Sequence, residues 1–130
     1  MTKKLFLFAL LIIGFLIISE KQVNSQTMYF CEGVTDAGRP ITDSDVFNIK
    51  NEGDYVYCLV RLPYEVACYS VRLEVYRNGA YDNTIYVDTE KSWQWFWKKI
   101  EFYKSGNYTF YCYDCFDYML TSGSVKIQWK

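Results

Sequence analysis

Apolar and polar residues alternate with a period of two along much of the chain after residue 26, which predicts β-strands with one buried face. The clearest case is 68–77, where Val71, Leu73 and Val75 alternate with charged or polar residues. No stretch of this part shows a sustained helical period or an internal repeat. The strands predicted in this way span 27–31, 55–62, 68–77, 81–87, 93–103, 107–114 and 124–129.

Turn residues separate these stretches and predict how neighbouring strands connect. Asn78-Gly79 lies directly between two alternating stretches and predicts a tight hairpin, because both residues tolerate the positive φ of a type I′ turn. Ser105, Gly106 and Asn107 predict a turn between the two aromatic strands of 93–114. We expect these two strands to form the centre of the fold, and 27–31 to be an edge strand.

The first of the aromatic strands has two apolar faces. In strand geometry Trp93, Trp95 and Trp97 share one face, while Phe96 and Phe102 share the other face with Ile100. A two-layer sandwich has one core, so both faces cannot be core. Either a bulge near Lys98-Lys99 exchanges the faces, or the tryptophans cover something outside the core.

The last third of the chain resembles a known family. The segments F-Y-K-S-G-N-Y-T-F-Y-C-Y-D (102–114) and L-T-S-G-S-V-K-I (120–127) resemble the last two strands of immunoglobulin-like and fibronectin III-like domains of exported bacterial proteins, which carry Gly-x-Tyr before the penultimate strand. The resemblance implies a fold and no functional residue. The fold class predicted is all-β, an immunoglobulin-like antiparallel β-sandwich of about seven to eight strands.

The N-terminus has the layout of a secretory signal peptide. Lys3 and Lys4 precede a 14-residue apolar run, and a polar segment ends at Ser25. The run is shorter than the roughly 20 residues that cross a bilayer. We predict a signal peptide over 1–25, a single domain over 26–130, a secreted or periplasmic location, and no membrane insertion after cleavage.

Charge and composition argue against several functions. Without Lys3, Lys4, Lys21 and Glu20, the 14 basic and 15 acidic residues become 11 and 14, a net charge of −3. This mild acidity argues against nucleic-acid binding. The chain has no histidine, which removes His-based catalysis and most zinc sites. We therefore predict no catalytic residue, no metal site and no cofactor, and a protein that is not an enzyme.

Five cysteines lie after residue 26, and an exported domain is expected to form disulfides. The candidates are Cys31, Cys58, Cys68, Cys112 and Cys115. We favour pairing Cys58 with Cys68, and Cys31 with Cys112 or Cys115; a Cys58–Cys112 bridge between facing sheets is the alternative. With five cysteines, at least one thiol stays unpaired.

The row of Trp93, Trp95 and Trp97 is the candidate binding site. Exposed aromatic rings stack on the C–H faces of sugars and anchor protein interfaces, so a glycan or a protein partner are both considered, against the alternative that the rings are core. We predict a small exported non-catalytic binding or interaction protein of the cell envelope or extracellular space. The alternatives are a thiol/disulfide protein that uses Cys112 and Cys115, and a structural subunit that pairs through an edge strand.

Overall fold

The computed structural model describes residues 27–50 and 53–130, which form nine strands and no helix. The predicted signal peptide over 1–25, and its cleavage after Ser25, lie outside the described residues. No helix that could span a membrane occurs in the described part of the chain. The strands are β1 (Met28–Val34), β2 (Pro40–Asp43), β3 (Val46–Ile49), β4 (Asp54–Arg61), β5 (Ser70–Arg77), β6 (Ala80–Asp88), β7 (Trp95–Phe102), β8 (Gly106–Tyr113) and β9 (Met119–Trp129).

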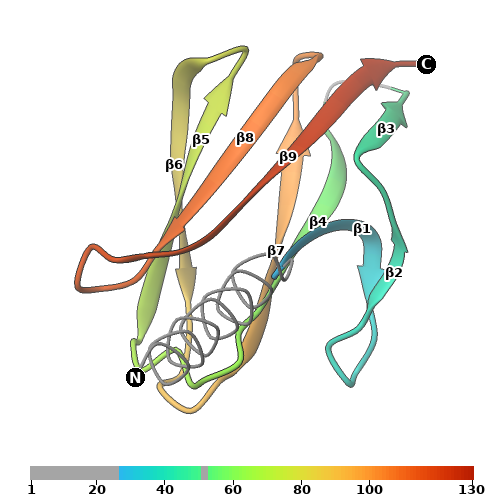
Figure 1. Cartoon of the computed structure of the whole chain (residues 1–130). Helices are drawn as coiled ribbons and strands as arrows, with labels where there is room; N and C mark the ends of the chain where they lie inside the picture. Colours follow the sequence, from blue (N-terminus) through green and yellow to red (C-terminus); the bar gives the residue numbers. More distant parts are fainter. Residues whose placement is uncertain (1–26, 51–52) are drawn as a thin grey trace, which may run out of the picture.

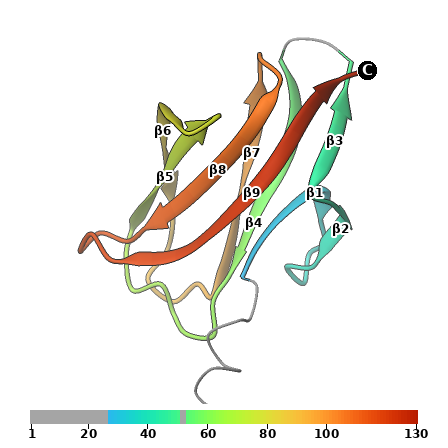
Figure 2. The same ribbon diagram turned by 45° about the horizontal axis from the view of Figure 1, so that its top comes forward.

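The strands form two sheets packed face to face (Figure 1). Sheet A has the order β2-β1-β4-β7 and sheet B the order β3-β9-β8-β5-β6. All pairs are antiparallel except β3 with β9. Figure 2 shows β8 and β9 of sheet B in front of β4 and β7 of sheet A. The prediction of an all-β antiparallel sandwich is confirmed; the strands beyond the predicted number are the four-residue β2 and β3.

The core consists of the inward residues of both sheets. Phe30 of sheet A packs on Phe110 of sheet B with ring centroids 5.1 Å apart, and Phe102 packs on Tyr108 at 4.9 Å. These rings contact edge to face, the arrangement that aromatic quadrupoles favour. Apolar burial from both layers therefore holds the sandwich together.

The hairpin predicted at Asn78-Gly79 is confirmed. Asn78 has φ 52° and Gly79 has φ 83°, so both occupy the left-handed region that a type I′ turn requires. The turn joins β5 to β6, and their pairing contains an irregularity between Val75 and Tyr76.

The aromatic stretch 93–114 is divided between the two sheets. β7 is an edge strand of sheet A, whereas β8 lies inside sheet B between β9 and β5. The predicted turn thus connects the two layers, because the core-facing rings of β7 meet those of β8 across the interior. The expectation that 27–31 is an edge strand was wrong, since β2 pairs with the outer side of β1.

Candidate functional site

The three tryptophans proposed from the sequence line one hollow of about 700 Å³. The residues that line it run from the end of β6 into the start of β7. Figure 1 shows this connection at one end of the sandwich. Its lining residues are Asp88, Ser92, Trp93, Gln94, Trp95, Phe96 and Trp97.

Trp95 and Trp97 reach the hollow because they lie on the outer face of sheet A. The pairing of β4 with β7 runs without a bulge from Asp54↔Phe102 to Arg61↔Trp95, so the faces of β7 do not exchange at Lys98-Lys99. Phe96 is buried in the core, whereas Trp97 is 46% exposed. Of the two alternatives left by the sequence, the structure shows tryptophans outside the core.

Trp95 forms the fixed wall of the hollow. Its ring lies against Gly38 in the turn between β1 and β2, so closely that a Cβ at Gly38 would overlap the indole. Gly38 has φ 76°, a conformation that glycine adopts without strain. The Arg61 guanidinium donates a hydrogen bond to the Gly38 carbonyl. Trp95 is half-buried for this reason and contributes to stability as well as to the site.

Trp93 lies in the loop before β7 and is held by its backbone. The Val66 N–H donates to the Trp93 carbonyl at 2.7 Å, and the Ala67 N–H donates to the Lys91 carbonyl at 2.9 Å. The Trp93 indole is 43% exposed. The loop between β4 and β5 thus positions the backbone, while the ring stays accessible.

Polar side chains complete the hollow. Asp88, Ser92 and Gln94 are exposed, and their side chains form no hydrogen bond with any other residue of 27–50 or 53–130. The sequence pattern did not identify these three residues, because Asp88 lies between the predicted strands 81–87 and 93–103 and nothing in the pattern placed it beside the tryptophans. Free acceptors and donors beside flat apolar rings suit a ligand with hydroxyl groups.

One disulfide links the loops beside this site. Cys68 and Cys115 are bonded, with Cα atoms 5.9 Å apart. The pairings favoured from the sequence, Cys58 with Cys68 and Cys31 with Cys112 or Cys115, were wrong. The reason is that β5 pairs with β8, which places the start of β5 next to the residues that follow β8.

The remaining thiols are buried and unsuited to redox cycling. Cys31, Cys58 and Cys112 are free and buried. Burial, with the nearby Asp114 carboxylate, raises the pKa of Cys112 to about 12, and burial also raises the pKa of Cys58 and of Cys31. Since Cys115 is bonded to Cys68, the proposed cycling of Cys112 with Cys115 is wrong for this structure.

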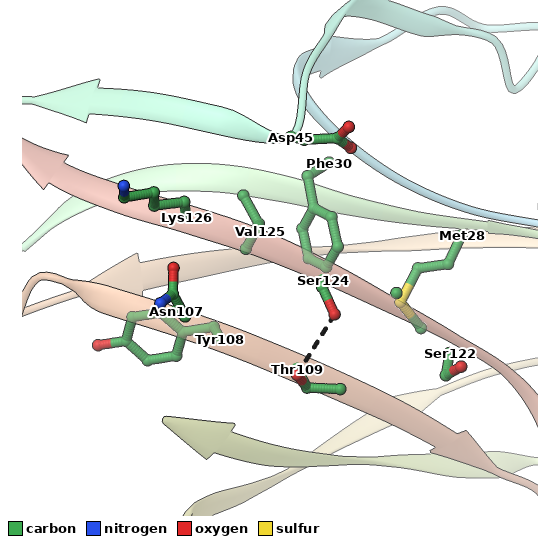
Figure 3. Close-up of a pocket in the computed structure, with 11 residues that line it drawn as sticks. Met28, Phe30, Asp45, Asn107, Tyr108, Thr109, Ser122, Ser124, Val125 and Lys126 are labelled. Carbon is green, nitrogen blue, oxygen red and sulfur yellow. Dashed lines mark hydrogen bonds between the residues drawn. The ribbon is translucent and has the colours of Figure 1, made fainter. Parts of the chain in front are cut away.

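A second hollow, of about 560 Å³, opens between β1 and β9 (Figure 3). It exists because β3 pairs only with the last part of β9, from Lys126 onward. Its wall combines small polar side chains of β8 and β9 with apolar side chains that include Met28 and Phe30 of β1, and Thr109 and Ser124 hydrogen-bond to each other at 3.3 Å. None of the predicted site residues lies here.

The described residues contain no group of three or more Cys, Asp or Glu side chains arranged to hold a metal ion. The sequence contains no histidine to add to such a group. The polar groups of the Trp-lined hollow include a single carboxylate, that of Asp88. The chemistry that this arrangement offers is therefore stacking and hydrogen bonding.

Comparison with known proteins gave structural matches only. No family model and no curated protein matches the chain. A solved structure of superoxide reductase (neelaredoxin) from Ignicoccus hospitalis is similar at a TM-score of 0.45 and 16% identity, covering 81% of each chain. A second structure of superoxide reductase (neelaredoxin) from the same organism is similar at a TM-score of 0.42 and 16% identity, covering 67% of this chain and 76% of that chain.

These two structures contradict the prediction that the chain is not an enzyme and acts as a non-catalytic binding protein or structural subunit, because both are enzymes by name. That prediction is withdrawn. At 16% identity and TM-scores below 0.5, the likeness transfers no reaction, metal or site residue to this chain.

Proposed function

We propose that the hollow lined by Trp93, Trp95 and Trp97 is a saccharide-binding site. The observation that carries the proposal is the exposure of two indole rings, 43% for Trp93 and 46% for Trp97, on a surface with unpaired polar side chains. Pyranose rings present flat C–H faces that stack on aromatic rings, and their hydroxyl groups need donors and acceptors at the rim. Such a site occurs in enzymes and in non-enzymatic proteins, so the proposal names a ligand class and no reaction.

The arrangement of the rings supports a rigid site. Trp95 is fixed by Gly38, and the Trp93 backbone is fixed by Val66, so little conformational freedom is lost when a ligand binds. Asp88, Ser92 and Gln94 supply carboxylate, hydroxyl and amide groups without first breaking an intramolecular hydrogen bond. A purely apolar ligand would leave these groups desolvated and unpaired, which disfavours it.

We also propose that the domain is exported, as a member of the bacterial immunoglobulin-like or fibronectin III-like group that its last strands resemble. The Cys68–Cys115 disulfide supports an oxidising compartment. Saccharides of the cell surface are accessible there.

The test is binding to neutral cello-, xylo-, manno- and chito-oligosaccharides, followed by intrinsic fluorescence and calorimetry. Trp97→Ala is expected to weaken binding of the preferred sugar at least tenfold, since truncating an aromatic anchor typically costs more than about 1.4 kcal/mol. Trp93→Ala is expected to act in the same direction. Trp95→Ala is unsuitable, because loss of the ring would also disturb the turn at Gly38.

Trp129→Ala is the matched control. Trp129 is 44% exposed and lies at the end of β9, at the opposite end of the sandwich from the hollow (Figure 1). Equal binding by the Trp97 and Trp129 variants, both folded by circular dichroism, would disprove the proposal, as would a failure of every tested saccharide to bind.

A further inference from the structure

We propose that the binding site continues from the hollow along the outer face of sheet A, and that its ligand is an acidic oligosaccharide whose anionic group binds to Lys99. This inference rests on the proposed saccharide site and specifies the charge and the length of its ligand. Its basis is a row of aromatic side chains outside the hollow together with Lys99, which lies over one of these rings and forms no ion pair with a carboxylate of the described residues.

The aromatic row is continuous with the hollow through Trp97. The Trp97 ring, which lines the hollow, lies 5.3 Å from the Tyr57 ring, and Tyr57 lies 5.6 Å from Tyr55, measured between ring centroids. Tyr55 is 44% exposed and Tyr57 is half-buried. The two steps of the row, 5.3 and 5.6 Å between ring centroids, are each close to the advance of one 1,4-linked pyranose unit along an extended chain. The row therefore extends the site by roughly two sugar units beyond the hollow.

The strands beneath the row are rigid. The pairing of β4 with β7 is unbroken across all these positions, with Leu59 opposite Trp97 and Tyr57 opposite Lys99. Leu59 is fully buried although it lies on the outer face, which shows that neighbouring side chains cover it closely. The rings of the row contact one another edge to face, with interplanar angles of 74° and 86°, so they form a continuous ridge along the sheet that fits an extended chain better than a compact ligand.

Lys99 supplies the charge. Its ammonium nitrogen lies 3.9 Å from the centroid of the Tyr55 ring, and the side chain is exposed. The ion pairs found within 27–50 and 53–130 both involve Arg72, so no described carboxylate neutralises Lys99. The next acid on this face, Glu101, accepts a hydrogen bond from the Tyr103 hydroxyl at 2.8 Å.

An unpaired cation placed beside stacking rings complements an anionic sugar. A neutral sugar would use the rings but not the charge, whereas a carboxylate or sulfate on a sugar in contact with the Tyr57 ring or with the edge of Tyr55 would lie within reach of the ammonium group over Tyr55. The polar groups at the other end, around Asp88, are better suited to neutral hydroxyls because the carboxylate repels anions. The site thus has one end for neutral sugar units and one for acidic units.

The experiment compares oligogalacturonate and chondroitin sulfate fragments with neutral cello-oligosaccharides of equal length, by calorimetry at low and at high salt. An acidic ligand is expected to bind more tightly than its neutral counterpart at low salt, and the difference is expected to shrink as salt rises. Lys99→Gln is expected to weaken acidic binding about fivefold to tenfold and to weaken neutral binding much less. Because chondroitin sulfate carries a uronate carboxylate beside its sulfate, tighter binding of chondroitin sulfate than of unsulfated chondroitin of equal length would assign the anionic group to sulfate, and equal binding of the two would assign it to the carboxylate.

Lys104→Gln is the matched control, because Lys104 is an exposed lysine in the turn between β7 and β8. Tyr55→Ser provides a second, independent variant and is expected to weaken binding of longer fragments more than of short ones. The inference is overturned if acidic and neutral fragments bind equally, or if Lys99→Gln and Lys104→Gln behave alike. In that event a loss of binding in Trp97→Ala would still support the saccharide site, so the two proposals fail separately.

Discussion

The disulfide between Cys68 and Cys115 is predicted to be the largest single contribution to stability beside the core. It closes a loop with a sequence separation of 47 residues. In the chain-entropy treatment, closing a loop of this length destabilises the unfolded state by about 4 kcal/mol at 25 °C. For a domain of this size, with a urea slope of about 1 to 1.5 kcal/mol per molar, the midpoint would fall by about 3 M when the bond is removed.

The perturbation is the double variant Cys68→Ala, Cys115→Ser, which replaces the buried half of the disulfide with a small apolar side chain and the exposed half with a hydroxyl. Urea unfolding, followed by tryptophan fluorescence without reductant, measures the change. Wild-type protein unfolded with reductant is the control and should show the same midpoint as the variant. An unchanged midpoint in the variant would refute the reasoning.

The same variant also tests how the site is held. The Thr89 hydroxyl donates a 2.5 Å hydrogen bond to the Cys68 carbonyl, and the neighbouring Val66 N–H holds the Trp93 carbonyl. Loss of the disulfide is therefore expected to loosen the loop that carries Trp93. A red shift of the native emission, together with weaker saccharide binding in the folded variant, is the expected result.

Two further predictions concern buried groups, and a third concerns a glycine. The three free thiols should not react with iodoacetamide in the native protein at pH 8, and all three should react after denaturation. Alkylation of only one thiol per denatured molecule would contradict their unpaired state. Because the pKa of Cys112 rises from 9.0 to about 12 on folding, the unfolded chain loses this proton first, and unfolding experiments should show stability falling as pH rises above about 9. Gly38→Ala should lower thermal stability more than Gly79→Ala: both glycines have positive φ, but an added Cβ meets the Trp95 ring at Gly38 and open space at Gly79. Equal melting temperatures for the two variants would argue against the packing of Trp95 on Gly38.

Local patterns in the sequence were sufficient for the elements that depend on neighbours in the chain. Alternation predicted β4, β5, β6 and β8 within one or two residues at each end, because side chains of a strand alternate between faces whatever the strand pairs with. The hairpin at Asn78-Gly79 was predictable for the same reason, since two adjacent residues determine a type I′ turn. The short β2 and β3 were missed, because four-residue strands carry too little alternation to be distinguished from a loop.

The tryptophans of the candidate site could be identified from the sequence. Their exposure, and the residues that surround them, could not. The row of tryptophans stood out in the sequence, but its exposure depends on which face of β7 the other sheet covers. Gly38, Asp88 and Tyr57 lie far from one another in the sequence, and only the folded sandwich brings them to the tryptophans.

Alternation along the chain is sufficient to predict that the chain is all-β, where its main strands lie and which residues share a face. Tertiary structure decided that β7 and β8, adjacent in the chain, belong to different sheets, and that β5 beside β8 brings Cys68 to Cys115. The physical reason is that a period of two specifies the face of a strand but not its partner. Partners are chosen by burial of apolar surface between residues distant in sequence, a property of the whole chain.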